Sequence, residues 1–185
     1  MISATDLRKG VSFLMDGELY RVLDYQHSYI GRGSANVRTK LRNLHTGRTV
    51  DRTFSAGYKF QEVRLELRQV QFLYQDGDLY YFMDTETYEQ PALSADALGD
   101  KINYLKEGSV LSLSMYEDHP VEIELPVTVD LKIAETVPGI RGNTATGATK
   151  RAKLETGLVV QVPLFIEEGD VIRVDTRTAE YLTRV

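Results

Sequence analysis

A single arginine stands between two glycines near the start of the chain, since Arg32 follows Gly31 and precedes Gly33. Glycine lacks a side chain and adopts positive φ readily, so a loop of this composition is narrow at its tip. Tyr29 and Ser34 flank the glycines and would support the loop. These residues predict a slender projection that carries one guanidinium into a crowded polyanionic site, and RNA is the polyanion that we expect.

The segment after this loop continues the positive charge along an expected strand. Arg38, Lys40 and Arg42 are spaced by two, and alternate residues of an extended strand share one face. Cations on such a face recur every ~6–7 Å, which roughly follows successive phosphates along a nucleic acid strand. We predict a basic row that faces RNA, and the alternative is an ordinary solvated strand face.

Two later regions also carry residues suited to RNA. The segment Gly139–Lys150 is rich in small polar residues and reads as a long exposed loop, whose backbone amides could meet phosphates or bases. It is not a P-loop, because Ala148 stands where that motif requires lysine, and a plain connecting loop is the alternative. Near the C-terminus, Tyr181 and Arg184 pair an aromatic ring with a guanidinium. The alternative there is a tyrosine that closes a barrel beside a solvated arginine.

Catalysis and metal binding receive little support from the residue types. The chain has no cysteine, which excludes disulfides and thiolate metal sites. His27, His45 and His119 lack the spacing of metal ligands, so we expect surface or turn positions for them. The carboxylates are many, but none stands in a pattern that isolates an acid/base pair. We therefore predict no metal, no cofactor and no enzymatic activity, and an enzyme with an acidic cleft is the weakest alternative.

The net charge of −5 conceals a segregation along the chain. Residues 1–64 contain 11 Lys and Arg against 6 Asp and Glu, residues 65–127 contain 3 against 13, and residues 128–185 contain 8 against 8. Attraction to phosphate acts over roughly one Debye length, about 8–10 Å at physiological salt, so local balance matters more than the total. A basic first part and an acidic middle could orient the molecule on an RNA surface.

Short strands separated by turns must position these residues. Asp16-Gly17 and Asp76-Gly77 are hairpin signals between apolar or alternating runs. Strands are expected over 11–15, 18–25, 35–44, 48–54, 70–74, 79–83, 110–116, 121–125, 127–134, 158–162 and 171–174. Regular short strands of this kind predict an all-β protein made of barrels.

Helical signals are brief. Thr5 or Asp6 could cap one turn that ends at Gly10, and Ser94 could cap Ala95–Leu98 before Gly99. A weak internal repeat, Asp-Thr-x-Thr at residues 84–87 and again at 175–178, marks either equivalent turns in two similar barrels or a coincidence.

Two soft breaks divide the chain into three predicted domains. The charge changes near residues 64–66, and Pro126 separates two apolar strands. The predicted domains are therefore residues 1–64, 65–127 and 128–185. No run approaches the ~18 apolar residues of a membrane span, and the N-terminal residues lack a signal-peptide core. We expect a cytoplasmic monomer without membrane contact.

The segment Lys150–Gly169 resembles the signature of bacterial elongation factor P, K-x-A-x4-G-x2-[LV]-x-V-P-x2-[LIV]-x2-G, at every fixed position. Three further stretches, 80–84, 138–142 and 175–184, are similar to the same family, and the similarity covers essentially the whole chain. The resemblance implies an SH3-like barrel followed by two OB-folds in an L-shape similar to tRNA. A paralogous elongation-factor-P-like protein shares much of this pattern and stays an alternative.

The same resemblance implies a function. The family binds both subunits of the ribosome beside peptidyl-tRNA and relieves stalling when consecutive prolines are joined, without itself changing a covalent bond. It would steady the tRNA, which is a positioning effect. The alternative outside the family is a general single-stranded nucleic-acid binder built on barrels.

The resemblance also assigns roles to residues. Arg32 would contact the acceptor end of peptidyl-tRNA, as the lysine or arginine at the family's loop tip does. The tip residue is often modified, so Arg32 either acts unmodified or is the substrate of an arginine-modifying enzyme. Gly31, Gly33 and Ser34 differ from the Gly-Arg-Asn run associated with rhamnosylated members.

Two further contacts follow from the resemblance. A loop beside the exit-site codon of messenger RNA would comprise Pro138, Gly139, Arg141, Gly142 and Asn143. Asn143 and Arg151 depart from the usual aspartate and proline, which affects the detail of that contact. Tyr181 and Arg184 would contact the anticodon stem of peptidyl-tRNA.

Overall fold

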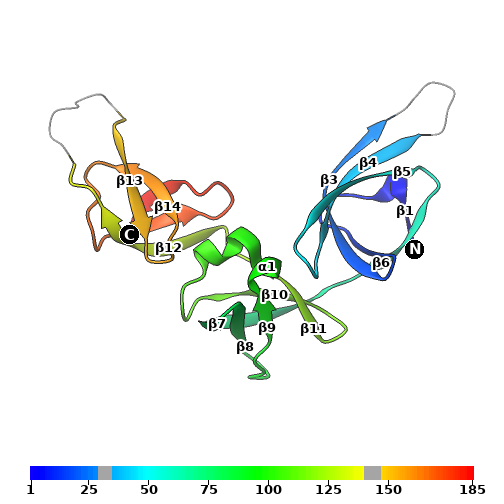
Figure 1. The fold of residues 1–185 in the computed structure, drawn as a ribbon, viewed down its shortest axis with the longest axis horizontal. Helices are drawn as coiled ribbons and strands as arrows, with labels where there is room; N and C mark the ends of the chain where they lie inside the picture. The colour runs from blue at the N-terminus through cyan, green and yellow to red at the C-terminus, as the bar shows by residue number, and fades with distance from the viewer. Residues whose placement is uncertain (29–34, 140–146) are drawn as a thin grey trace.

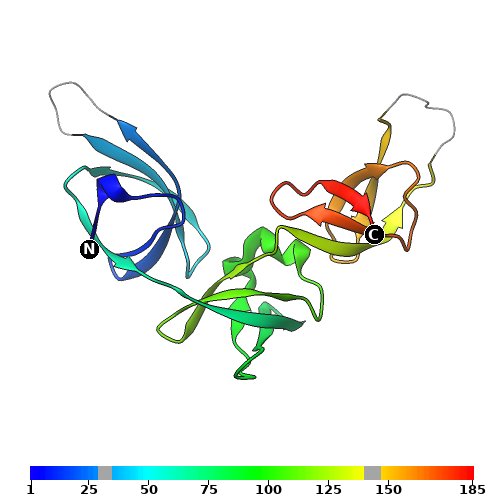
Figure 2. The same ribbon diagram turned by 180° about the vertical axis from the view of Figure 1, so that it is seen from behind.

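The computed structural model describes residues 1–28, 35–139 and 147–185. The described strands form three antiparallel sheets that follow one another along the chain. Two arms rise from a central unit, with the N-terminus in one arm and the C-terminus in the other (Figure 1). Seen from behind, the short helix of the central unit again lies between the arms (Figure 2).

The first arm is a barrel-like sheet with the order β1-β6-β2-β3-β4-β5. Its elements are β1 (Ile2–Ser3), a 3-10 helix η1 (Ala4–Asp6), β2 (Ser12–Met15), β3 (Glu18–Ser28), β4 (Asn36–Asn43), β5 (Thr49–Ser55) and β6 (Lys59–Val63). Alternate residues point inward, so Phe13, Val22 and Leu41 are buried in one core, where Phe13 packs on Phe60 at 4.3 Å between ring centroids.

The central unit has the sheet order β11-β10-β7-β8-β9. Its elements are β7 (Glu66–Asp76), β8 (Leu79–Asp84), β9 (Ala92–Ser94), α1 (Ala95–Leu98), a 3-10 helix η2 (Gly99–Tyr104), β10 (Val110–Tyr116) and β11 (His119–Glu124). The predicted cap is confirmed, because the Ser94 hydroxyl accepts a hydrogen bond from the Ala97 N–H and Gly99 ends the helix at φ 55°.

The second arm has the sheet order β14-β13-β12-β15-β16. Its strands are β12 (Thr128–Thr136), β13 (Thr149–Leu154), β14 (Val159–Pro163), β15 (Val171–Asp175) and β16 (Tyr181–Arg184). The core of this arm includes Tyr104 from the central unit beside Ile133, Val162 and Ile172. The second arm is therefore joined to the central unit through a shared apolar cluster.

The internal repeat marks equivalent turns. In both copies the first residue, Asp84 or Asp175, accepts a backbone N–H from the residue two positions on at 2.8 Å. A third copy without the repeat's sequence begins at Asn43, whose side-chain oxygen accepts from the N–H of residue 45 at 2.9 Å. In all three turns the fifth residue donates to the first carbonyl at 2.9 Å and has positive φ: Gly47 (72°), Tyr88 (62°) and Ala179 (60°).

The all-β class with an SH3-like barrel followed by two OB-folds is confirmed, but several local expectations need correction. The first helical turn is the 3-10 helix η1 after Ser3, earlier than the cap predicted at Thr5 or Asp6. Strands β1, β6, β9, β13 and β16 were not expected. Lys150 belongs to β13 and is only 8% exposed, so the predicted loop 139–150 ends earlier. Among the described residues, no helix is long and apolar enough to cross a membrane.

Candidate nucleic-acid interface

The β3–β4 hairpin carries the predicted arginine loop. Its last described pair is Ser28 opposite Asn36, and residues 29–34 join the two strands. The predicted loop residues Tyr29, Gly31, Arg32, Gly33 and Ser34 lie outside the described residues. The described part of the hairpin rises away from the central unit toward the far end of the first arm (Figure 1).

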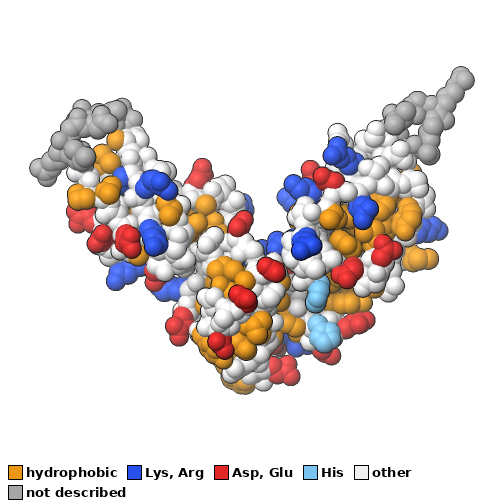
Figure 3. Space-filling view, viewed as in Figure 1, with side chains coloured by type: hydrophobic (Ala, Val, Ile, Leu, Met, Phe, Trp, Pro, Cys, Tyr) orange, Lys and Arg blue, Asp and Glu red, His pale blue; other side chains and the backbone are white. Residues whose placement is uncertain are grey.

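The predicted basic row lies on one face of β4 only in part. Arg38 and Lys40 are exposed, while the residues between and beside them point into the core. Lys40 stands opposite Asp24 on β3 and Asp51 on β5, both exposed, so acidic side chains interrupt the row. Figure 3 shows basic and acidic side chains interspersed on this arm. This face is therefore mixed in charge.

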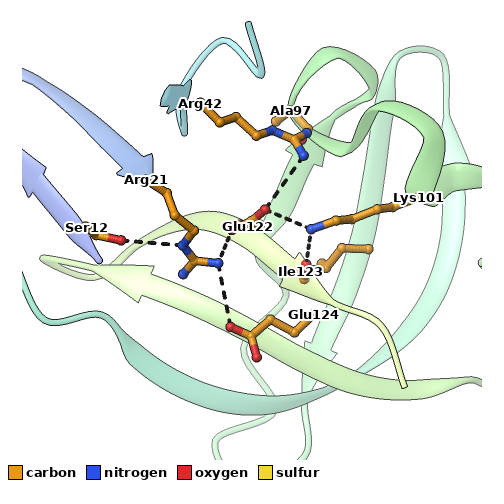
Figure 4. Close-up of polar contacts among 8 residues, drawn as sticks. All are labelled: Ser12, Arg21, Arg42, Ala97, Lys101, Glu122, Ile123 and Glu124. Carbon is orange, nitrogen blue, oxygen red and sulfur yellow. Dashed lines mark hydrogen bonds and ion pairs between the residues drawn. The ribbon is translucent and has the colours of Figure 1, made fainter. Parts of the chain in front are cut away.

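Arg42 shares the strand spacing but turns toward the central unit (Figure 4). Its Nη2 donates to the Ala97 carbonyl at 3.1 Å, and its Nη1 lies 3.8 Å from Glu122. The structure thus separates Arg42 from Arg38 and Lys40, because its guanidinium is occupied at a junction between domains. The spacing by two gave no sign of this, since the acceptors come from residues more than fifty positions later.

The same junction holds three cations around one carboxylate. Glu122 on β11 is bonded to Arg21 of β3, and its Oε1 accepts from Lys101 Nζ at 2.8 Å. Lys101 also donates to the Ile123 carbonyl at 2.6 Å. The Glu122 side chain is 7% exposed. Burial lowers the pKa of the Lys101 ammonium, and the Glu122 carboxylate opposes that shift.

Apolar side chains close the junction around these charges. Leu19, Leu44 and Val63 of the first arm are buried in a cluster that includes Tyr116 and Val121 of the central unit. The turn after β4 presses on α1 so closely that a Cβ at position 47 would lie 2.2 Å from the Asp96 carbonyl oxygen. The first arm is therefore seated on the central unit by both packing and ion pairs.

The predicted codon-side loop begins at the end of β12. Pro138 and Gly139 are exposed, whereas Arg141, Gly142 and Asn143 lie outside the described residues. Lys150 Nζ donates to the Val137 carbonyl at 2.8 Å, which fixes the backbone just before the loop. A Cβ at position 139 would lie 2.7 Å from the Leu164 carbonyl oxygen, so glycine is required for this close approach.

The two C-terminal residues singled out in the sequence lie on β16. Tyr181 is half-buried against the core of the second arm. The Arg184 side chain is 54% exposed, and its guanidinium lies 5.6 Å from the ring centroid of Phe165 and 3.8 Å from Asp170. Phe165 is itself 60% exposed, and sequence reasoning missed it. The structure thus places a packed tyrosine near an exposed arginine, whose guanidinium contacts an aromatic ring and lies near a carboxylate.

The turn before β16 is held by Asp175. Its carboxylate accepts from Arg177 Nη2 at 2.7 Å and from the Arg177 N–H at 2.8 Å. These bonds favour the ionised form and lower the pKa of Asp175 to about 2. Tyr181 and Arg184 therefore follow a turn that is fixed by an ionised carboxylate.

The described residues contain no cluster of three or more His, Cys, Asp or Glu side chains that could hold a metal ion. His27 lies on β3 with its ring 5.5 Å from that of Tyr25, and His119 begins β11. His45 lies in the turn that begins at Asn43. The three histidines stand at a strand face, a strand end and a turn.

Comparison with known proteins accounts for the whole chain. Three family models match it in sequence: the KOW-like domain of elongation factor P over residues 3–60, its OB domain over 65–123, and its C-terminal domain over 129–184. The chain belongs to the elongation factor P family. Elongation factor P of Thermoanaerobacter sp. (strain X514) is 52% identical and that of Moorella thermoacetica 53% identical, each over 100% of both chains.

Membership in the elongation factor P family makes this chain a translation elongation factor. Among solved structures, a protein described as eukaryotic translation initiation factor 5A from Methanococcus jannaschii is similar, with a TM-score of 0.52 and 21% identity. The match covers 66% of this chain and 90% of that one, and at this identity it bears on the fold alone.

Proposed function

We propose that this elongation factor binds the ribosome beside peptidyl-tRNA and promotes peptide-bond formation at consecutive prolines, without being an enzyme. Family membership supports the first part of the proposal. The observation that carries it is the β3–β4 hairpin, which extends from a closed junction at Arg21 and Arg42 to the pair Ser28–Asn36. The Arg32 loop joins the strands at that far end.

The hairpin acts as a spacer of defined length. Ser28 lies seven residue steps beyond Arg21, and a strand rises ~3.3 Å per residue, so the loop begins roughly 23 Å from the junction. A single guanidinium at the end of such a spacer can neutralise phosphates and hold the acceptor end of a tRNA. Proline is a rigid and poor nucleophile, so its reaction gains from alignment of the peptidyl-tRNA more than from acid or base catalysis.

The second arm supplies two further contacts in this proposal. The loop that begins at Pro138 and Gly139 approaches the exit-site codon, with Arg141, Gly142 and Asn143 as its contact residues. The exposed guanidinium of Arg184, beside Tyr181, meets the anticodon stem. Peptidyl-tRNA, both ribosomal subunits and messenger RNA are therefore the proposed partners, and the cytoplasm is the proposed location.

The test is a reconstituted translation assay with Arg32→Ala. We expect peptides with proline runs to form more slowly with this variant, while peptides without them form at the unchanged rate. Arg52→Ala is the matched control, because Arg52 is an exposed arginine on β5 of the same arm. Equal synthesis of proline runs with Arg32→Ala and the unchanged chain would reject the proposed role of Arg32.

Two measurements separate the remaining alternatives. Intact-mass spectrometry of the natively produced protein reports whether Arg32 carries an added group. Binding to free single-stranded RNA as tight as binding to ribosomes would favour a general nucleic-acid binder. The net charge of −10 in residues 65–127 argues against that alternative, since a strand tracking across the molecule would meet an acidic surface.

A further inference from the structure

The first arm presents two arginines side by side. Arg21 on β3 and Arg42 on β4 are directly opposite each other in the antiparallel register. Like charges in that position repel, and both side chains are less than 20% exposed, so water screens them only in part. Within the first arm, the described residues offer no carboxylate in ion-pair distance of either guanidinium.

The compensating carboxylate comes from the central unit. Glu122 is bonded to Arg21 through one oxygen, and its other oxygen lies 3.8 Å from Arg42 Nη1 and 2.8 Å from Lys101 Nζ (Figure 4). Three cations from two domains therefore share one buried anion. If the arm swung away, Glu122 would lose two partners and the arginine pair would lose its counter-ion, which makes the ionic contact sensitive to direction.

The surrounding apolar contacts hold the domains together but do not by themselves set an angle. Leu44 and Val121 belong to an apolar cluster, and apolar attraction favours contact without favouring one direction. The hydrogen bonds from Arg42 to the Ala97 carbonyl and from Arg21 to Glu122 cross the junction and have directional geometry. The ionic cluster, together with the close contact of the Gly47 turn on α1, is thus a part of the junction that can specify orientation.

We propose that Glu122 is a positioning residue that fixes the angle between the first arm and the central unit, and so determines where the Arg32 loop is delivered. The proposal rests on the proposed function of that loop. A rotation of about 10° at the junction moves Ser28, roughly 23 Å away, by about 4 Å. Misplacement of about 1 Å at a reacting centre can cost about 100-fold in rate, so the angle matters to the outcome.

The helical segment of the central unit connects this angle to the second arm. Lys101 and Tyr104 lie on the same short helix η2, and Tyr104 is buried in the core cluster of the second arm. Through Lys101, η2 holds the Glu122 carboxylate that binds the first arm, and through Tyr104 it enters the core of the second arm. A change at Glu122 is expected to alter the first arm relative to the second as well.

The angle can be measured without the ribosome. The sequence contains no cysteine, so Thr53→Cys on β5 and Asp76→Cys at the end of β7 would carry spin labels at two defined, exposed sites. Pulsed electron paramagnetic resonance then reports the distribution of distances between the arm and the central unit. We expect one narrow distance in the unchanged full chain and loss of that narrow distance in Glu122→Gln and Glu122→Ala.

The matched control is Glu124→Gln. Glu124 lies on the same strand and 3.7 Å from Arg21, but its side chain is 44% exposed. We expect the narrow distance between the two labels to persist in Glu124→Gln. Glu122→Asp keeps the negative charge. If Glu122→Ala does not fold, Glu122→Asp shows whether a folded chain with a carboxylate at this position has the narrow distance. A narrow, unshifted distance in both Glu122→Gln and Glu122→Ala would overturn the proposal.

A second experiment measures the synthesis of proline-run peptides with the same variants. With Glu122→Gln we expect a lower rate of proline-run synthesis at saturating factor. The variant would still bind, but only a fraction of the bound molecules would hold the arm at the angle that places the loop correctly. Broadened distances with an unchanged saturating rate would overturn the functional half of the inference. Failure of the proposed function itself is distinguishable, because Arg32→Ala would then be without effect while the distance measurement still responds to Glu122.

Discussion

Gly47 offers the sharpest test of how closely the first arm is seated on the central unit. It has φ +72°, and a Cβ built on it would lie 2.2 Å from the Asp96 carbonyl oxygen and 3.1 Å from the Asp96 carbonyl carbon. Both atoms are backbone atoms of α1, so no side chain can rotate to make room. Gly47→Ala must therefore move the turn away from α1 or strain both.

Two costs add in this variant. The left-handed conformation costs an alanine about 1–2 kcal/mol. Overpacking a close contact costs about 1–3 kcal/mol more, because the neighbouring backbone must shift. We expect Gly47→Ala to lower the free energy of unfolding by about 2–5 kcal/mol in total. Part of that loss is avoided if the arm separates from the central unit, and the interdomain distance then lengthens.

Gly17→Ala is the control that isolates the clash. Gly17 lies in the hairpin turn between β2 and β3 of the same arm, with φ +80° and no atom within 4 Å of a built Cβ. It should lose only the conformational cost, about 1–2 kcal/mol. Chemical denaturation of both variants and the distance between labels at positions 53 and 76 are the measurements. Equal stability losses and equal distances in the two variants would refute the close seating of this turn.

Two further predictions concern the second arm. Asp175 has its pKa lowered to about 2, so its ionised form stabilises the fold above pH ~3.8 and that contribution is lost as the pH falls toward 2. Asp175→Asn should be less stable than the unchanged chain at pH 7 in denaturant titrations, with a difference that shrinks below pH ~4; a constant difference would contradict this account. Gly139→Ala should destabilise this arm by about 1–3 kcal/mol through contact with the Leu164 carbonyl. The control is Gly57→Ala between β5 and β6 of the first arm, where a built Cβ has no atom within 4 Å, so no such contact lowers the stability of that variant. Equal stability of the two variants would refute the contact at Gly139.

Local sequence patterns were sufficient for one hairpin turn and for the one α-helix of the described residues. Asp16-Gly17 forms a tight turn with both residues at positive φ, and Ser94 and Gly99 bound α1 as their types predict. In these cases the residues that determine the backbone path are neighbours in the chain. The third copy of the Asx turn shows the limit, because Asn43 makes the same bonds as Asp84 and Asp175 in a segment without the Asp-Thr-x-Thr repeat.

Side-chain roles that depend on distant partners could not be read in the same way. Lys150 belongs to a segment that reads as a loop, yet it is buried and holds the Val137 carbonyl. Phe165 is one apolar residue among many in the signature, and only β16 places Arg184 against its ring. The spacing of Arg38, Lys40 and Arg42 identified a common strand face but not the turn of Arg42 toward Glu122.

The sequence by itself determined the family and the all-β class, because each depends on residue types at fixed local spacing. Tertiary structure alone decided which cations remain exposed and which hold the domains together. Arg21 and Glu122 are 101 residues apart, and their contact exists only because two separately folded sheets pack against each other. That packing gives Arg42 a partner that no local pattern encodes.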